Sequence, residues 1–305
     1  MPSKIRPDKP LGKEVRRIAA AYLERARSEL TDKPGGPHEA IHTARKQFKR
    51  VRGLYRLVAS GAGAFQKAEN ERIGNMARGL SAARDQTTLI ETARRLAIAA
   101  DTAGEHMAVI RICERLVERR SAAPHMSEEN LESAITGAIV TCGEALNALD
   151  RLDLDTTPKG AADLLGNGWS RTGKKALAAL ASARETGDAE SFHTLRKRSQ
   201  DRWMQCGFLE QAWPSMFKAA RIRAKQLVDA LGEKQDISVL NSFLDSQSGD
   251  LASAEDTAHL IAVMIREGER RRSEALKLAA DVFDGTPKRD GDLVAKIWRR
   301  AARGR

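Results

Sequence analysis

The strongest constraint on the fold of this chain is an internal repeat. The pentapeptide HTARK at residues 42–46 returns as HTLRK at residues 193–197, an offset of 151 positions in a chain of 305 residues. At the same offset, the pattern L-x4-D-x3-L at residues 80–89 returns at residues 231–240. Two separated blocks that keep one register indicate a structural unit present twice. Each copy begins with a histidine followed by cations.

The composition indicates that this unit is helical. Leu, Ala, Glu, Arg and Lys dominate, aromatic residues are only 4% of the chain, and β-branched residues do not form alternating runs. Short connections between amphipathic segments favour antiparallel neighbours. We therefore expect an all-α fold of two antiparallel, four-helix-bundle-like halves related by a pseudo-two-fold axis. We place a disordered tail at residues 1–10, the first half at 11–152 and the second half at 153–305, together forming one domain.

The net charge narrows the class of partner. The chain has 52 Lys and Arg against 41 Asp and Glu, so its formal net charge is +11 and its pI is about 9.8. Such a charge favours nucleic acid, phosphate polymers or anionic surfaces as partners, although it also keeps a protein dispersed. No apolar signal segment and no run of roughly 20 apolar residues is present, so we expect no membrane insertion. The three cysteines show no pairing pattern, which indicates small buried residues in a reducing cytoplasm.

Positive charge is concentrated in the repeated segment. Residues 42–56, HTARKQFKRVRGLYR, contain six cations and no acid. On a helix, this segment would carry a cationic stripe about 20 Å long on one face and apolar residues on the other. The stripe comprises His42, Arg45, Lys49, Arg52 and Arg56, and the apolar face comprises Ala44, Phe48, Val51, Tyr55 and Val58. Like charges at these spacings destabilise an isolated helix, so they favour a polyanionic ligand over a merely solvated face.

The second copy, HTLRKRSQDRW at residues 193–203, is less basic, because Asp201 stands where the first copy has Arg50. Asp201 follows Lys197 by four residues, so we expect these two to pair on one helix face. The two halves would then contribute unequally to binding. Cations of the helices that precede the two basic helices are expected to complete a basic concavity: Arg16, Arg17, Arg171, Lys174 and Lys175.

The repeated histidines and aspartates suggest different roles. Cations beside His42 and His193 disfavour protonation of the imidazole, and a bound anion would restore it. We therefore expect both histidines to contact phosphate oxygens rather than the backbone alone. Asp85 and Asp236 are most simply explained as N-caps of the helices that follow them. Alternatively, their carboxylates could orient a His or Arg of the basic helix.

Residues 38–42, HEAIH, match the H-E-x-x-H pattern of zinc proteases, in which two histidines of one helix face bind the metal. The second copy reads AESFH, so His38 has no counterpart while His42 has one. No third ligand is suggested by the spacing, and Arg45 and Lys49 would repel a dication. We expect no metal site and no cofactor. The sequence also lacks a Walker A loop, a G-x-S-x-G elbow and a Cys-x-x-Cys pair.

The duplicated H-x-x-R-K start, the basic helix and the downstream L-x4-D-x3-L block resemble the CHAD domain, the conserved histidine α-helical domain. The resemblance covers about residues 11–300. It implies two helical halves around a basic cavity, binding of inorganic polyphosphate, and association with cytoplasmic polyphosphate granules. Some relatives carry a triphosphate-tunnel catalytic domain with an E-x-E-x-K strand. That pattern is missing here, so the resemblance implies a binding protein and not an enzyme.

The phosphate-contacting positions implied by this resemblance are His42, Arg45, Lys46, Lys49, Arg50, Arg52 and Arg72, and then His193, Arg196, Lys197, Arg198, Arg202 and Arg223. The chain departs from the family pattern at Asp201 and at Gln235, which implies weaker binding by the second half. Two alternatives stay open. One is a nucleic-acid-binding helical protein, although the stripes lack interleaved aromatic residues for stacking. The other is an enzyme that acts on phosphorylated substrates.

Overall fold

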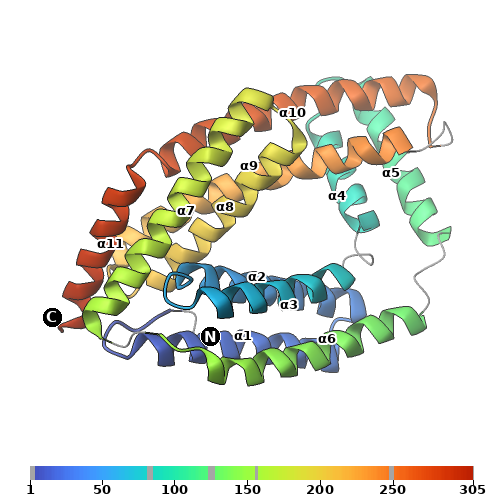
Figure 1. Cartoon of the computed structure of the whole chain (residues 1–305). Helices are drawn as coiled ribbons and strands as arrows, with labels where there is room; N and C mark the ends of the chain where they lie inside the picture. Colours follow the sequence, from blue (N-terminus) through green and yellow to red (C-terminus); the bar gives the residue numbers. More distant parts are fainter. Residues whose placement is uncertain (1–3, 81–84, 123–127, 155–156, 247–250, 305) are drawn as a thin grey trace.

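The computed structural model of the chain describes residues 4–80, 85–122, 128–154, 157–246 and 251–304. Within these ranges every regular element is a helix, which confirms the all-α prediction (Figure 1). The elements are α1 (Leu11–Asp32), α2 (Pro37–Leu57), α3 (Gly63–Gly79), α4 (Asp85–Ile98), α5 (Ala103–Ala122), α6 (Glu128–Ala148), the 3-10 turn η1 (Leu149–Arg151), α7 (Pro158–Thr186), α8 (Ala189–Leu209), α9 (Pro214–Ser246), α10 (Ala254–Val282) and α11 (Pro287–Ala302).

The helices are arranged in three packed groups (Figure 1). α1, α2, α3 and α6 lie along the lower edge of the view, and α7, α8, α11 and the first part of α9 form its left side. At the upper right, α4 and α5 pack against the far ends of α9 and α10. The chain therefore leaves the lower group after α3, builds part of the upper group, and returns through α6.

The hydrophobic core of the upper group joins the two halves of the sequence. Leu89 and Ile112 come from α4 and α5, Leu240 and Val263 come from α9 and α10, and each is at most 4% exposed. A second core combines the lower group with parts of α7, α8, α9 and α11. Apolar burial thus links the first half to the second at two places. The pseudo-two-fold relation of the halves stays a prediction.

The predicted two faces of the basic helix are confirmed on the apolar side. Pro37 lies in the first turn of α2, where a helix loses no hydrogen bond to the missing N–H. The apolar face is 0–1% exposed in all five members: Ala44, Phe48, Val51, Tyr55 and Val58. The three cysteines are free and buried, also as predicted. Burial of one face turns the cationic stripe of α2 away from the core.

The described part of the N-terminal segment is not the disordered tail that we expected. Ile5 is fully buried, and its N–H donates to the carbonyl oxygen of Phe208 at 2.9 Å. Nearby, burial alone would raise the pKa of Glu14, but hydrogen bonds from two arginines lower that pKa to about 2. One apolar residue in a polar stretch has no periodicity, so no sequence pattern indicates that this segment packs on α8.

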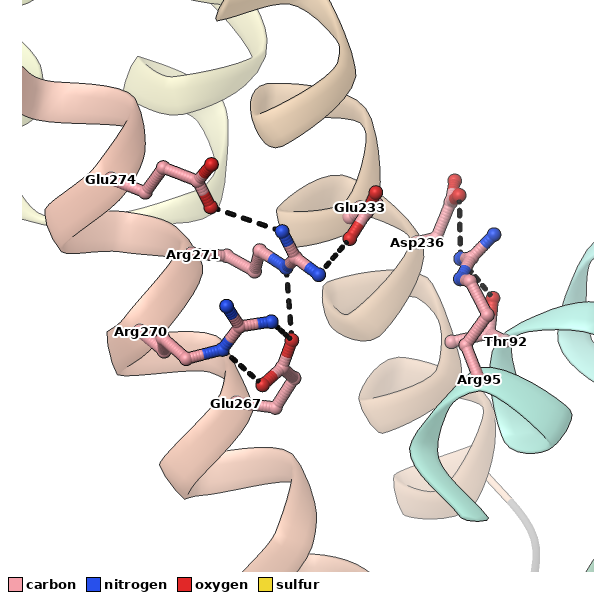
Figure 2. A network of polar contacts seen from close by, with 8 residues as sticks. All are labelled: Thr92, Arg95, Glu233, Asp236, Glu267, Arg270, Arg271 and Glu274. Carbon is pink, nitrogen blue, oxygen red and sulfur yellow. Dashed lines mark hydrogen bonds and ion pairs between the residues drawn. The ribbon is translucent and has the colours of Figure 1, made fainter. Parts of the chain in front are cut away.

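The second half has one helix, α9, where the first half has α3 and α4. The prediction that a helix begins after Asp236 is wrong, because Asp236 lies inside α9 and accepts a hydrogen bond from Arg95 of α4 at 3.0 Å (Figure 2). One turn earlier, Glu233 pairs with Arg271 of α10 at 2.6 Å. These two acids therefore connect α9 to α4 and to α10 by ion pairs. The side chain of Asp85, the other predicted cap, lies outside the described residues.

α2 and α8 cross each other at residues one repeat apart. A Cβ atom on Gly53 of α2 would lie 2.6 Å from the terminal methyl carbon of Met204, its counterpart at the 151-residue offset. α7 approaches the end of α2 even more closely, since a Cβ on Gly168 would lie 1.8 Å from the carbonyl oxygen of Leu57. Glycines therefore allow the two basic helices and α7 to converge.

Candidate functional site

Beside the crossing, a buried carboxylate connects the two basic helices. Asp201 of α8 is 2% exposed and accepts hydrogen bonds from Arg56 of α2 at 2.7 Å and from Arg198 at 3.2 Å. The expected pair between Asp201 and Lys197 is not formed; the structure places Arg198 and Arg56 there instead. Lys197 is exposed. The acid that seemed to weaken the second half therefore holds the two halves together.

Four cations interact with this carboxylate, and two more lie near them; we call the six the basic cluster: Arg52, Arg56, Lys175 and Arg198, with Arg78 beside Arg52 and Arg171 beside Lys175. Their mutual influence is visible in two pKa values. Burial lowers the pKa of the Arg52 guanidinium, and the charges of Arg56 and Arg78 lower it further against the opposing effect of Asp201. Burial likewise lowers the pKa of Lys175, with Arg198, Arg171 and Arg56 adding to the effect. The cluster is therefore a site of concentrated and incompletely neutralised positive charge.

Two cations of the α2 stripe, Arg45 and Arg52, turn toward α3. Arg45 donates through Nη1 to the carbonyl oxygen of Ala77, near the C-terminal end of α3. The guanidinium of Arg52 lies over Gly74, where a Cβ would sit 3.5 Å from it. In the second half, Arg196 takes a comparable position against α9, since a Cβ on Gly232 would lie 3.3 Å from its Nη2. Close packing on α3 and α9 thus fixes these long side chains.

His193 is half-buried at the start of the second stripe. Burial lowers its pKa, and the charge of Lys197 lowers it further, while a hydrogen bond with Gln235 acts in the opposite direction. The expected direction is confirmed, although burial is the larger cause. His42 is also half-buried, on α2. A histidine kept neutral in this way can accept a proton when an anion arrives.

Lys46 and Arg50 lie on a different side of α2. They line a groove of about 410 Å³ that we call the second basic groove, formed by Tyr22, Arg25, Thr43, Lys46, Gln47, Arg50 and Arg221. Among the described residues, this lining contains four cations and no carboxylate. Arg50 is held there by a hydrogen bond to Gln47 at 3.0 Å and by the ring of Tyr22, 5.6 Å from its guanidinium carbon. The basic surface therefore extends to both sides of α2.

The remaining predicted residues lie apart from the basic cluster. Arg72 pairs with Glu144 at 2.5 Å, and Arg223 pairs with Asp281 at 2.7 Å, so both are neutralised by acids of neighbouring helices. Arg202 is only 4% exposed, and its guanidinium packs on the ring of Trp169. Lys49 is exposed on α2. The predicted phosphate-contacting residues thus fall into three groups: residues of the basic surface, residues paired with acids, and one buried cation.

Sequence reasoning missed Arg78 of the basic cluster. The position one repeat later is Asp229, so the comparison of copies gave no reason to select it. Arg171 and Lys175 were expected, and both lie in the cluster. Lys174, on the same turn of α7, is exposed. The signal that would have found Arg78 is spatial, because only the packing of α3 against α2 brings it to Arg52.

In the described ranges, His, Cys, Asp and Glu nowhere form a group of three or more that could hold a metal ion. His38 and His42, the two histidines of the H-E-x-x-H match, both lie in α2. Over the same ranges, no helix combines the length and apolar character needed to cross a membrane. The chemistry offered by the basic cluster is that of charged hydrogen-bond donors.

Comparisons with known proteins agree with this geometry. The model of the CHAD domain family matches residues 13–245. Among solved structures, the crystal structure of the CHAD domain from the plant Ricinus communis is similar, with a TM-score of 0.62 and 18% sequence identity. The match covers 92% of this chain and 94% of that one. None of the curated proteins matches the chain. At this identity, the structural likeness establishes the fold alone.

Proposed function

The chain belongs to the CHAD domain family, and on that premise we propose that it binds inorganic polyphosphate without catalysing its breakdown. One observation supports the proposal above the others. Six cations from α2, α3, α7 and α8 form a cluster in which four interact with one buried carboxylate, Asp201, and the pKa values of Arg52 and Lys175 are lowered there. An anion bound at this cluster would relieve the repulsion between these cations.

A linear polyanion suits this surface better than a single phosphate group. The stripe of α2 continues from the cluster along about 20 Å of helix, and the second basic groove adds four cations on another side of α2. Arginine offers paired N–H donors to phosphate oxygens, and lysine offers a mobile point charge. Successive phosphates of one chain could therefore contact both halves of the protein. A location on cytoplasmic polyphosphate granules follows from the same proposal.

The direct test removes two cations of the basic cluster. The double variant R171Q/K175Q removes the two cations that α7 contributes to the cluster, and R115Q/R119Q removes the same charge from exposed positions of α5. We expect R171Q/K175Q to weaken binding of long-chain polyphosphate. The slope of log K against log salt should fall by about 1.4, since each lost phosphate contact accounts for about 0.7 on a single-stranded polyanion.

The control variant R115Q/R119Q should bind as the wild type does. If both double variants lose the same affinity, net charge governs binding and the cluster is not the site. Reversal of Arg45 and Lys49 to Glu is a second test of the stripe, with one complication: Arg45 also holds the carbonyl of Ala77. Circular dichroism must therefore show unchanged helicity before that variant is interpreted.

Two further measurements separate the alternatives. Competition between polyphosphate and single- or double-stranded nucleic acid at matched salt decides between the polyanions. Among the described residues, Trp213 is the one aromatic among the exposed large hydrophobic side chains, and it precedes α9 rather than lining the basic cluster, so we expect polyphosphate to win. Incubation with polyphosphate or nucleotides, with and without Mg²⁺, should release no phosphate. Release that R171Q/K175Q abolishes would replace the binding proposal with an enzymatic one.

A further inference from the structure

A separate cavity lies between α7, α8 and α11, close to the end of α10. Its volume is about 170 Å³. Its walls are part apolar and part polar, and the apolar side chains include Leu177, Met216, Phe283, Leu293 and Val294. One cation, Arg202, reaches into these walls. The basic cluster shares none of its six residues with this cavity.

Arg202 is the feature that needs explanation. Its side chain is fully buried, and its guanidinium carbon stacks 3.6 Å from the centre of the Trp169 ring. Nη2 donates to the carbonyl oxygen of Trp169 at 3.2 Å. The other two nitrogens, Nε and Nη1, are buried and have no hydrogen-bond partner. Burial lowers the pKa of Arg202 to about 10, so the guanidinium remains charged at neutral pH.

The carboxylates near the cavity leave two donors of Arg202 unused. Asp284 and Asp290 belong to its lining, and the charge of Asp290 raises the pKa of Arg202, yet neither carboxylate forms an ion pair with the guanidinium within 4.0 Å. A buried cation whose donors are unused is unfavourable unless an acceptor completes it. Leu293 belongs to the lining and is 46% exposed, so the cavity is not sealed from solvent.

We propose that this cavity is a binding site for a small monocarboxylate with an apolar body, held by the unused donors of Arg202. One fixed cation matches one negative charge, whereas a phosphate dianion would need further cations that the lining does not supply. The apolar walls suit a short alkyl or aryl group, and the volume limits it to a few carbon atoms. This site is independent of polyphosphate binding.

Hexanoate is a suitable probe, because hexanol and hexylammonium have the same apolar body with no charge or the opposite charge. Binding is followed by thermal shift and by tryptophan fluorescence, at ionic strength matched with sodium chloride. We expect hexanoate to bind about tenfold more tightly than hexanol, since a hydrogen bond to a charged group is the stronger kind. Hexylammonium should bind more weakly than either.

Two variants test the assignment to Arg202. R202M removes the charge but keeps an apolar side chain of similar length, and it should bind hexanoate no better than hexanol. L293E places a carboxylate at an exposed position of the lining, so we expect it to fold, to weaken hexanoate binding and to leave hexanol binding unchanged. The second variant decides the matter if R202M does not fold.

The proposal is overturned if the wild type does not distinguish hexanoate from hexanol at concentrations up to about 50 mM, a range suited to weak binding of so small a ligand. It is also overturned if folded R202M keeps the preference, or if L293E leaves hexanoate affinity unchanged. Polyphosphate binding by R202M is expected to be normal. Failure here therefore leaves the function proposed for the basic cluster untouched.

Discussion

Asp201 shows what a single residue can and cannot reveal in the sequence. The repeat identified it as the acid that breaks the symmetry between the two basic helices, and this was correct. The prediction of its partner was wrong. Spacing along one helix suggested Lys197, whereas the crossing of α2 and α8 brings Arg56 to Asp201. Pairs within a helix follow from spacing, but pairs between helices depend on a crossing that no local pattern encodes.

Replacing this carboxylate by an amide, D201N, should have opposite effects on stability and on binding. The cations of the basic cluster lose their buried counter-charge, so we expect the free energy of unfolding to fall by about 1–3 kcal/mol. Polyphosphate can supply the missing negative charge, so the variant should gain more stability from the ligand than the wild type does. Urea unfolding with and without polyphosphate measures both effects. An equal ligand-induced gain in the two proteins would contradict this role of Asp201.

His193 predicts a dependence of stability on pH. Its pKa is lowered in the folded protein by burial and by Lys197, so the unfolded chain binds a proton more readily. Stability is therefore lost as the pH falls from the ordinary histidine value of about 6.5 toward the lower folded value. We expect the wild type to lose more stability than H193Q between about pH 7.5 and 5.5. Parallel losses in urea unfolding would show that other groups govern this range.

At the scale of elements, helical structure could be predicted, but the absence of a helix boundary at Asp236 could not. The repeat suggested that a helix begins at Asp236 because the first half has a break near Asp85. In the second half, α9 instead continues through Glu233, Lys234 and Gln235. Asp236 then faces Arg95 of α4 instead of capping a helix. Equivalent residues in two copies need not have equivalent roles.

This arrangement predicts that the ion pair contributes little to the free energy of unfolding and that the apolar core of the same group contributes much more. The side chains of Arg95 and Asp236 are 44% and 23% exposed, so a double-mutant cycle with R95Q and D236N should give a coupling of about 0.2–1 kcal/mol. L240A, in the fully buried core of the same group, should cost about 2–5 kcal/mol. Chemical denaturation of the wild type and the four variants tests the ranking. A larger effect for D236N than for L240A would reverse it.

At the scale of the whole molecule, composition and periodicity were sufficient for the all-α class and the burial of one face of α2. They were not sufficient for the way in which the halves share their cores. A pattern of apolar residues shows which face of a helix is buried, but not which helix covers it. Thus α4 and α5 pack on α9 and α10, although both belong to the first half of the sequence. For the same reason Arg202 was grouped with the basic surface, when its side chain lies in another part of the fold.

Shared cores make a prediction about the halves as separate chains. A fragment of residues 1–152 would expose the surfaces of α4 and α5 that Leu240 and Val263 cover in the whole protein. We therefore expect neither this fragment nor residues 153–305 to unfold cooperatively alone, because each lacks part of two cores. Mixed or co-expressed, they should associate into a complex with the helicity of the intact chain. L240A in the second fragment should weaken that association, because Leu240 packs in the core that the fragments would share. Sedimentation and circular dichroism measure these outcomes. A monomeric first fragment with a sharp unfolding transition would show that the halves are independent domains, and that the cores common to both are dispensable for folding.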